Sequence, residues 1–383
     1  MTVGQQPEPS VFIQFAGQGV KYIDDLRRLY SQNPCVQPFI IDCIKEISIQ
    51  AKKYDDSKTG FFHCGIDIET WINSPGETPD QGYLLSSPLS HPLIFLTQIA
   101  NYLSLILDGL DQDKLIRNTH SATGFSTGVV AAILVSLNLP VDALIKKAIK
   151  TQAMFFWQGI RTQQSMFRKN IHPVIDSGKL STAEGSKSCM ASINNIMRKQ
   201  LDETIRLFSG QGTIHPSYEI FPGRWIVAGS PDHLEAFSRF LKGKNEKCEW
   251  RYIPSTIAAH SPYLDYALET SPVDAERIGL SFDAVDMKIP VLSNNDGIDL
   301  RESNAIIKDV MEAYFIRTAI WKKQISPLMP PTSVKYVLDF GPGPGVASLT
   351  ENFTTRSGIK VIRCSNPLGR KQLFDEMLPT LTA

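Results

Sequence analysis

A serine between two glycines is the first feature of the sequence that could do chemistry. Ser126 lies in Gly124-Phe125-Ser126-Thr127-Gly128, which fits the pattern G-x-S-x-G. In that pattern the serine occupies a sharp turn between a strand and a helix, and the flanking glycines make room for the strained backbone. The N-terminus of the following helix offers N–H groups to a developing oxyanion. The pattern also fits an ordinary turn serine, but the strand-like stretch before it and the Ala/Val-rich stretch after it favour a nucleophile.

A serine hydroxyl needs a neighbouring base in order to attack at neutral pH. His260 is the best-placed candidate in the sequence, because the small residues Ala258 and Ala259 precede it and a Ser-Pro turn follows. Small neighbours allow an imidazole ring to project into a cleft. The other histidines are typical of surface or core positions: His63, His91, His120, His172, His215 and His233.

Alternating apolar segments and glycines indicate an α/β body that would position this pair. Residues 11–15 (VFIQF) are almost continuously apolar and end at Ala16-Gly17-Gln18-Gly19, as a buried parallel strand does before a tight turn. Elsewhere in the body the pattern predicts helices over 92–107 (beginning at Pro92), 129–137, 141–169 (one or two) and 303–324, and strands over 289–292 and 334–340.

Between residues 187 and 253 the pattern changes to short strands and helices in the order βαββαβ. This order and the length of about 65 residues are typical of the ferredoxin-like split motif. The predicted elements are a strand over 189–193, a helix over 197–208, strands over 213–220 and 224–227, a helix over 230–241 with Ser230 as N-cap, and a strand over 247–253.

Composition limits the classes of function. The chain has 383 residues, with 39 Lys+Arg against 39 Asp+Glu, which gives no support for nucleic-acid or membrane-surface binding. Its six cysteines are scattered and form no CxxC pair, which argues against structural zinc and a dense disulfide framework. The N-terminus lacks the features of a signal peptide, and the apolar stretch 93–107 is shorter than the roughly 20 residues of a membrane span. We therefore expect a cytoplasmic protein with no metal and no permanently bound cofactor.

Three segments, taken in order, resemble the signatures of the malonyl/acyl-CoA:ACP transacylase family: Phe15-Ala16-Gly17-Gln18-Gly19, the segment around Ser126, and Ala259-His260-Ser261-Pro262-Tyr263-Leu264. The resemblance is closest to the fungal branch, which includes starter-unit ACP transacylase (SAT) domains of non-reducing polyketide synthases and the acetyltransferase domain of fatty acid synthase β chains. It covers about residues 10–365. It implies an α/β-hydrolase-like body with a parallel sheet over 10–186 and 254–370, an inserted ferredoxin-like subdomain over 187–253, and tails at 1–9 and 371–383.

The resemblance also implies roles for individual residues. Ser126 would attack the acyl thioester, and His260 would take its proton and return it to a thiol. The backbone N–H groups of Gln18 and Thr127 would form the oxyanion hole. In this family a backbone carbonyl, rather than an aspartate, orients the histidine, and the stretch around 314–321 matches that place loosely.

Two departures from the family pattern bear on substrate choice. Phe125 stands where the usual motif has a histidine, which predicts a more apolar mouth. Gln158 stands where malonyl-specific members have an arginine that pairs with the malonyl carboxylate. A neutral amide beside Phe155-Phe156-Trp157 cannot offset the desolvation of a carboxylate, so we expect a monocarboxylic acyl group; the aromatic run also fits plain core packing. The expected substrate-binding residues are Phe125, Phe156, Gln158 and Asn294.

The sequence thus predicts an acyltransferase that works through an acyl-Ser126 intermediate. The donor would be acyl-CoA or an acyl-phosphopantetheine on a partner synthase, and the acceptor the phosphopantetheine thiol of an acyl carrier protein. The starter-unit setting is favoured because a chain of this length beginning at Met suits the N-terminal domain of a polyketide synthase; the fatty acid synthase setting is the alternative. A serine esterase or thioesterase would need a late histidine, and none follows His260. Candidate docking charges for the acidic carrier protein, which equally fit a solvated helix face, are Lys146, Lys147, Lys150, Arg161, Arg168 and Lys169.

Overall fold

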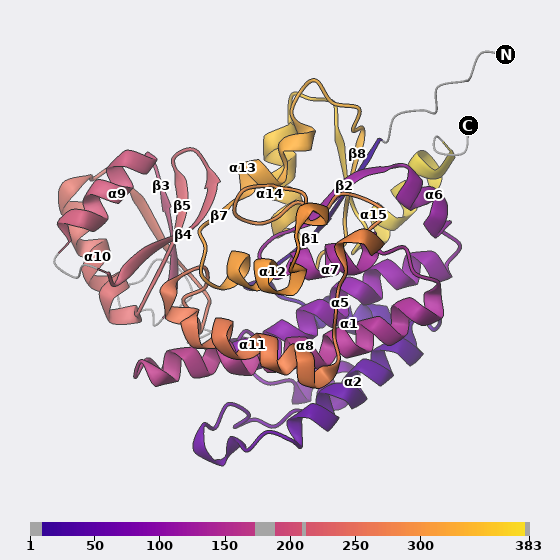
Figure 1. The fold of residues 1–383 in the computed structure, drawn as a ribbon, viewed down its shortest axis with the longest axis horizontal. Helices are drawn as coiled ribbons and strands as arrows, with labels where there is room; N and C mark the ends of the chain where they lie inside the picture. The colour runs from indigo at the N-terminus through magenta and orange to yellow at the C-terminus, as the bar shows by residue number, and fades with distance from the viewer. Residues whose placement is uncertain (1–9, 173–187, 209–211, 380–383) are drawn as a thin grey trace.

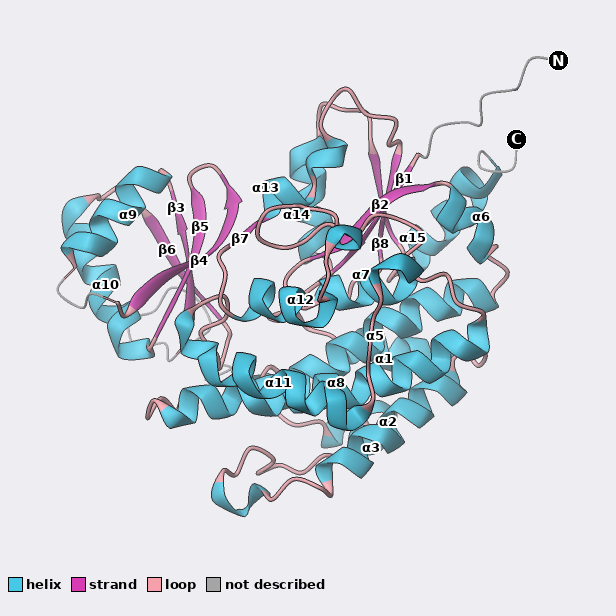
Figure 2. Cartoon of the chain, viewed as in Figure 1, coloured by secondary structure: helices cyan, strands magenta, loops and turns pink. Residues whose placement is uncertain are grey.

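The computed structural model describes residues 10–172, 188–208 and 212–379. Two β-sheets lie side by side, a four-stranded sheet in the larger body and a five-stranded sheet in a smaller lobe (Figure 1). Figure 2 shows that the long helices of the body gather on one side of its sheet, and that two helices cover the outer side of the smaller sheet.

The body sheet is parallel throughout and has the order β2-β1-β8-β9. Its strands are β2 (Thr119–Gly124), β1 (Val11–Phe15), β8 (Tyr336–Asp339) and β9 (Lys360–Arg363). Every residue of β1 is buried, which agrees with the continuous apolar run predicted for a parallel strand. The segment 289–292, predicted as a strand, contributes only two isolated bridges, Val291 with Ala122 and Leu292 with Asp299.

Two long helices form the centre of the core. They are α5 (Ser87–Leu107) and α8 (Val141–Arg168), and α8 is continuous over the region where one or two helices were expected. Helix α5 begins five residues before the predicted start at Pro92, because Pro88 already occupies the first turn after the extended Ser86. Of the described helices, α5 alone is long and apolar enough to span a membrane, but 94% of its most apolar window is buried inside the protein, as in a core helix.

The remaining helices of the body surround this core and the sheet edges. They are α1 (Ile23–Gln32), α2 (Gln37–Ala51), α3 (Ile68–Asn73), α4 (Gln81–Leu84), α6 (Gln112–Arg117), α7 (Gly128–Ser136), α11 (Asp265–Ile278), α12 (Ile306–Phe315), α13 (Trp321–Gln324), α14 (Gly345–Thr354) and α15 (Pro367–Gln372).

The smaller lobe has the predicted element order. It consists of β3 (Met190–Asn194), α9 (Arg198–Leu207), β4 (Ile214–Phe221), β5 (Arg224–Gly229), α10 (Pro231–Lys244) and β6 (Glu249–Ile253). These strands are antiparallel in the order β6-β3-β5-β4, the arrangement of a ferredoxin-like sheet. Ser230 caps α10 by accepting a hydrogen bond from the His233 amide. The α/β body with a ferredoxin-like insertion is therefore confirmed.

One predicted helix was wrong. Residues 303–324 form α12, the two-residue strand β7 (Ala319–Ile320) and α13 in place of one helix. The chain leaves the helix at Phe315 because Ala319 and Ile320 pair in parallel with Tyr218 and Glu219 of β4. This pairing gains ladder hydrogen bonds that a continuing helix would forgo. It also adds a strand of the body to the sheet of the smaller lobe.

Candidate active site

Ser126 lies on the turn between β2 and α7 in a left-handed conformation, with φ of 54°. Close backbone packing explains the glycines around it. A Cβ atom on Gly124 would lie 1.9 Å from the Gly128 carbonyl carbon, and one on Gly128 would lie 2.2 Å from the Ala16 carbonyl oxygen. The strained serine is therefore held by neighbours that only glycine can provide, as a nucleophile elbow requires.

The Ser126 hydroxyl contacts the imidazole predicted to act as its base. The distance from Ser126 Oγ to His260 Nε2 is 2.8 Å, although the two residues are 134 positions apart. On its other side, His260 Nδ1 lies 3.0 Å from the carbonyl oxygens of both Ala313 and Arg317. Since carbonyl oxygens only accept hydrogen bonds, Nδ1 carries the proton and Nε2 is free to accept the proton of Ser126.

His260 is held in its neutral form. The ring is only 2% exposed, and burial lowers its pKa to about 4, while the hydrogen bonds to Arg317 and Ala313 act in the opposite direction. A neutral imidazole that accepts at Nε2 can serve as a general base at physiological pH. The two carbonyls also provide negative dipoles that stabilise the imidazolium formed when the serine is deprotonated.

A cavity of about 430 Å³ opens at this pair. Gln18 forms part of its wall, and a Cβ on the neighbouring Gly17 would lie 2.2 Å from the Phe125 carbonyl oxygen, so the loop after β1 lies directly against the nucleophile turn. Neither the Gln18 nor the Thr127 amide donates a hydrogen bond within the described parts of the chain. Both amides are therefore available to an oxyanion. The Gln18 side chain is anchored through Nε2 to Ser90 Oγ at 3.0 Å.

Asn294 was predicted to bind substrate, but the structure gives it a different position. Its side chain is fully buried, and Nδ2 donates to the Ser126 carbonyl oxygen at 2.9 Å. The Asn294 carbonyl in turn accepts from Gln324 Nε2 at 2.9 Å and from the Ile320 amide at 2.9 Å. Asn294 is absent from the residues that line the cavity at Ser126. It therefore holds the backbone of the nucleophile turn.

Tyr218 of β4 connects the smaller lobe to the same turn. Its hydroxyl accepts a hydrogen bond from Gln324 Nε2 at 2.6 Å, and its ring stacks on Phe125 with 4.1 Å between centroids and 2° between planes. The ring also meets His260 edge-on, with centroids 5.4 Å apart. Phe125 thus lines the cavity as part of an aromatic wall, which agrees with the predicted apolar mouth.

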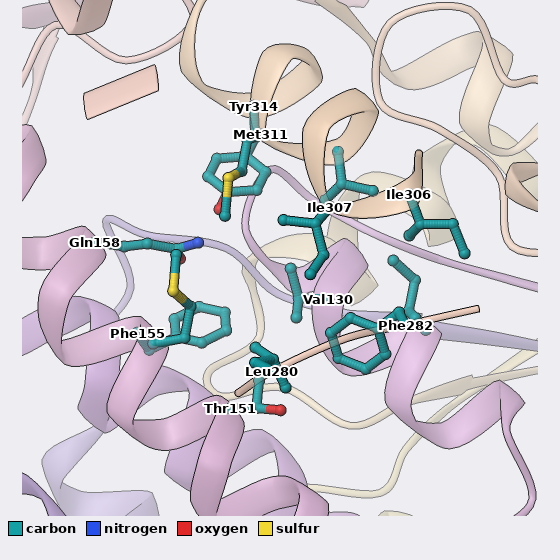
Figure 3. Close-up of a pocket in the computed structure, with 13 residues that line it drawn as sticks. Val130, Thr151, Phe155, Gln158, Leu280, Phe282, Ile306, Ile307, Met311 and Tyr314 are labelled. Carbon is teal, nitrogen blue, oxygen red and sulfur yellow. The ribbon is translucent and has the colours of Figure 1, made fainter. Parts of the chain in front are cut away.

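Gln158 lies in a second cavity, of about 330 Å³, between α7, α8 and α12 (Figure 3). Its side chain is 2% exposed, and Oε1 has no hydrogen-bond partner in the described structure. In Figure 3 the amide points across the cavity toward Met311 and Tyr314. The rest of the lining is largely apolar: Val130, Ile133, Thr151, Met154, Phe155, Leu280, Phe282, Ile306, Ile307 and Val310.

Phe156, also predicted to bind substrate, lines neither cavity. Its ring packs against Phe62, with centroids 5.9 Å apart, and against Trp157. Successive helix residues point about 100° apart, so Phe155 and Phe156 face different sides of α8. The prediction for Phe156 was therefore wrong, and Phe155 is the aromatic residue of this run that reaches the cavity.

The family profile described as "Starter unit:ACP transacylase in aflatoxin biosynthesis" matches residues 13–260, a range that includes both Ser126 and His260. The chain belongs to this family. It is therefore an acyltransferase of the carrier-protein transacylase type.

Curated relatives of this transacylase are fatty acid synthase β subunits. The chain is 26% identical over 381 residues to the subunit TOXC of Cochliobolus carbonum, 27% identical over 374 residues to that of Saccharomyces cerevisiae, and 26% identical over 396 residues to aflB of Emericella nidulans. These matches cover 91–96% of this chain but only 18% of each relative. The chain thus spans about a fifth of the length of these relatives.

Solved structures with a similar fold are malonyl-CoA:acyl carrier protein transacylases. The enzyme from Xanthomonas oryzae superposes with a TM-score of 0.71 at 15% identity, covering 97% of this chain and 99% of that one. The enzyme from Clostridium perfringens gives 0.69 at 17% identity, covering 97% and 98%. A type II polyketide synthase malonyl-transacylase in complex with its acyl carrier protein gives 0.65 at 16%, covering 95% and 98%. At these identities the likeness establishes the fold.

The candidate docking charges of the transacylase on α8 are partly engaged within the chain. Arg161 forms a two-pronged ion pair with buried Asp274, at 2.7 and 3.2 Å, and lies over the Trp157 ring. Lys169 pairs with Asp265 at 3.0 Å, and Arg168 lies over the ring of Tyr266. Lys147 lies over the ring of Phe282. These contacts favour a structural role for this face of α8.

The family resemblance implied that a backbone carbonyl from about residues 314–321 orients His260, and the structure places Arg317 in that stretch and Ala313 directly before it. A carbonyl carries no side-chain signal, so only the backbone course at the end of α12 identifies these two. Sequence reasoning missed Tyr218 and Gln324. Tyr218 and Gln324 come from two segments more than 100 residues apart and meet because β7 pairs with β4. A local sequence pattern contains no information on a contact between such distant segments.

Proposed function

We propose that this chain transfers a monocarboxylic starter acyl group to the phosphopantetheine thiol of an acyl carrier protein through an ester on Ser126. The donor would be acyl-CoA or the acyl carrier protein of a partner synthase. The observation that carries the proposal is the 2.8 Å contact between Ser126 Oγ and neutral His260 Nε2 beside two available backbone amides. Family membership supports the reaction class.

The first half-reaction acylates the enzyme. His260 Nε2 takes the hydroxyl proton as Ser126 Oγ attacks the thioester carbonyl carbon, and the carbonyl oxygen becomes an oxyanion that the amides of Gln18 and Thr127 stabilise. As the tetrahedral intermediate collapses, the C–S bond breaks and the imidazolium returns the proton to the departing thiolate. The products are a free thiol and an ester on Ser126.

The second half-reaction reverses these roles with a new thiol. The phosphopantetheine thiol gives its proton to His260 as its sulfur attacks the ester carbonyl carbon. The C–O bond to Ser126 then breaks, and the serine oxygen recovers the proton from the imidazolium. Atoms and protons balance without a further reactant. The same two amides stabilise the oxyanion in both halves.

Gln158 and the cavity around it support the choice of a monocarboxylic acyl group. A carboxylate placed there would meet a neutral amide and apolar side chains, and it would lose its hydration without gaining a cation. An alkyl chain would instead be favoured by the apolar lining. Acetyl, a longer alkanoyl group or a reduced polyketide chain fits this chemistry.

The biosynthetic setting is proposed to be polyketide starter loading, on the strength of the family description. The alternative setting, the acetyltransferase part of a fatty acid synthase β chain, is favoured by relatives that match more than nine-tenths of this chain. In both settings the partner is an acyl carrier protein, by analogy with the malonyl-transacylase complex of similar fold. A cytoplasmic location goes with the proposal, since all six cysteines are free thiols.

Mass spectrometry of the intact protein tests the proposal directly. The wild type, Ser126→Ala and the control Ser31→Ala, at an exposed serine on α1, would each be incubated with acetyl-CoA, hexanoyl-CoA or malonyl-CoA. We expect acetyl or hexanoyl adducts on the wild type and the control, little malonyl adduct, and none on Ser126→Ala. Addition of a holo acyl carrier protein should then move the acyl group to the carrier. An adduct that survives Ser126→Ala, or equally fast malonyl loading, would refute the proposal.

A further inference from the structure

His260 has a left-handed backbone conformation, with φ of 54°, which residues other than glycine rarely adopt. Five such residues occur in the described parts of the chain. Three are asparagines, which tolerate this conformation best, and the other two are Ser126 and His260 themselves. A strained backbone of this kind persists only where the surrounding structure holds it. The contacts on either side of His260 must therefore supply this restraint.

Strand β4 of the smaller lobe has a bulge that contacts the residue before the histidine. Two consecutive residues of β5 pair with Pro216 and Tyr218, so Ser217 between them has no partner in this pair of strands. An extra residue of this kind bends a strand and redirects a side chain, and bulges are frequent next to active sites. The Ser217 side chain is fully buried, and its hydroxyl donates to the Ala259 carbonyl oxygen at 2.9 Å. The bulge thus restrains the backbone directly before His260.

The neighbouring residue of the bulge contacts the segment that orients the imidazole ring. The Pro216 carbonyl oxygen accepts a hydrogen bond from Thr318 Oγ1 at 2.7 Å. Thr318 directly follows Arg317, whose carbonyl oxygen lies 3.0 Å from His260 Nδ1. Adjacent residues of the bulge, Pro216 and Ser217, therefore hold both the backbone before the histidine and a carbonyl that orients its ring.

We infer that the bulge of β4 positions His260 for proton transfer, through the hydroxyls of Ser217 and Thr318. This inference rests on the proposed function. Neither residue lines the cavity at Ser126, so both act through the histidine and are positioning residues. Proton transfer needs Nε2 within hydrogen-bond reach of the serine hydroxyl, and that contact is 2.8 Å. Loss of either hydroxyl would release one of the two restraints, and a misplacement of about 1 Å can cost about a hundredfold in rate.

Substitutions that remove one hydroxyl each provide the test. Ser217→Ala and Thr318→Val remove the two hydrogen bonds, whereas Thr318→Ser retains the second. The matched controls are Ser238→Ala on α10 and Thr204→Val on α9, because each hydroxyl donates to a carbonyl of its own helix in the same lobe, at 2.8 and 2.6 Å. Steady-state transfer to a holo acyl carrier protein would be measured with acetyl-CoA and hexanoyl-CoA, after circular dichroism has shown that each variant is folded.

We expect kcat to fall about tenfold in Ser217→Ala and in Thr318→Val, with KM unchanged, and to stay at the wild-type value in Thr318→Ser and in both controls. The same substitutions would also be combined with His260→Ala, with imidazole in the buffer as an external base. No further loss is expected in this background, because an external base does not depend on the backbone at residue 260.

A loss of the same size in the His260→Ala background, which is what a merely structural role predicts, would overturn the inference. So would an unchanged kcat in Ser217→Ala and Thr318→Val, or a loss in Thr318→Ser equal to that in Thr318→Val. If instead His260→Ala transfers acyl groups at the wild-type rate without imidazole, or no donor acylates Ser126, it is the proposed function that fails.

Discussion

The protonation state of His260 can be tested through the pH dependence of acylation. Burial lowers its pKa from 6.5 to about 4, which corresponds to about 3 kcal/mol in favour of the neutral ring. At pH 5.5 a histidine with its ordinary pKa would be about nine-tenths protonated, whereas His260 would remain almost entirely neutral. We therefore expect kcat/KM for acylation to change little between pH 7 and pH 5.5, where an ordinary histidine would lose about eightfold in rate.

The assay is single-turnover acylation by an acyl-CoA donor, followed by quenching and mass spectrometry, at closely spaced pH values from 4.5 to 8. Because kcat/KM reports the free enzyme, the fall in kcat/KM on the acidic side of the pH–rate profile, its acid limb, gives the pKa of His260 in the enzyme without substrate. The variant Tyr218→Ala removes the ring that meets His260 edge-on and admits water, so its acid limb should move toward 6.5. A wild-type limb near 6.5 would refute the argument that burial keeps this imidazole neutral.

The same burial also makes the free energy of unfolding depend on pH. The direction of this dependence is opposite to that of a salt-bridged histidine, which stabilises the fold at low pH. Below pH 6.5 the unfolded chain binds a proton at His260, whereas the folded chain stays neutral down to about 4, so stability falls as pH decreases through this window. His91, also buried with a pKa of about 4, contributes in the same direction. Each should account for about 2 kcal/mol of lost stability between pH 7.5 and pH 5. His91→Gln should remove half of this loss in urea denaturation without moving the acid limb of acylation.

Three further substitutions test the walls of the site. Asn294→Ala removes the hydrogen bond to the Ser126 carbonyl and should lower kcat about tenfold with little change in KM, measured as steady-state transfer; an unchanged kcat would contradict the positioning role. Gln158→Arg places a cation in the second cavity and should raise malonyl loading relative to hexanoyl loading in the adduct assay, and an unchanged ratio would show that this position does not select the acyl group. Phe125→Ala loses the stack on Tyr218 and should lower stability by about 3 kcal/mol in urea denaturation, with a loss below 1 kcal/mol arguing against a packed wall.

Local patterns were sufficient for the parts of the site that depend on neighbours in sequence. The turn at Ser126 could be predicted because only glycine fits at positions 124 and 128. A Cβ at either position would collide with backbone atoms of the turn itself or of the adjoining loop. The insertion could be predicted because each of its strands and helices has its own periodicity and ends at turn residues. The family signature that contains His260 could be matched because it is a short continuous segment.

The features of the fold and site that could not be predicted depend on tertiary contacts between segments that are distant in sequence. The apolar residues over 303–324 have a spacing that fits a helix, but the pairing of β7 with β4 outweighs helix propensity there. Phe156 and Phe155 are equivalent in a list of aromatic residues, and only the rotation of α8 decides which of them faces the cavity. Asn294 is equally ambiguous, since an amide can bind a ligand or a carbonyl of its own chain.

The smaller lobe supports the turn that carries Ser126 through this same pairing of β7 with β4. Tyr218 belongs to the lobe, Gln324 and Asn294 belong to the body, and the chain of hydrogen bonds through them ends at the Ser126 carbonyl. Since Tyr218 also stacks on Phe125, a displacement of β4 would disturb both the backbone and the aromatic wall of the nucleophile turn. The apolar residue before the serine is thus matched to its partner in the lobe. The insertion therefore helps to hold the turn that carries Ser126 in place.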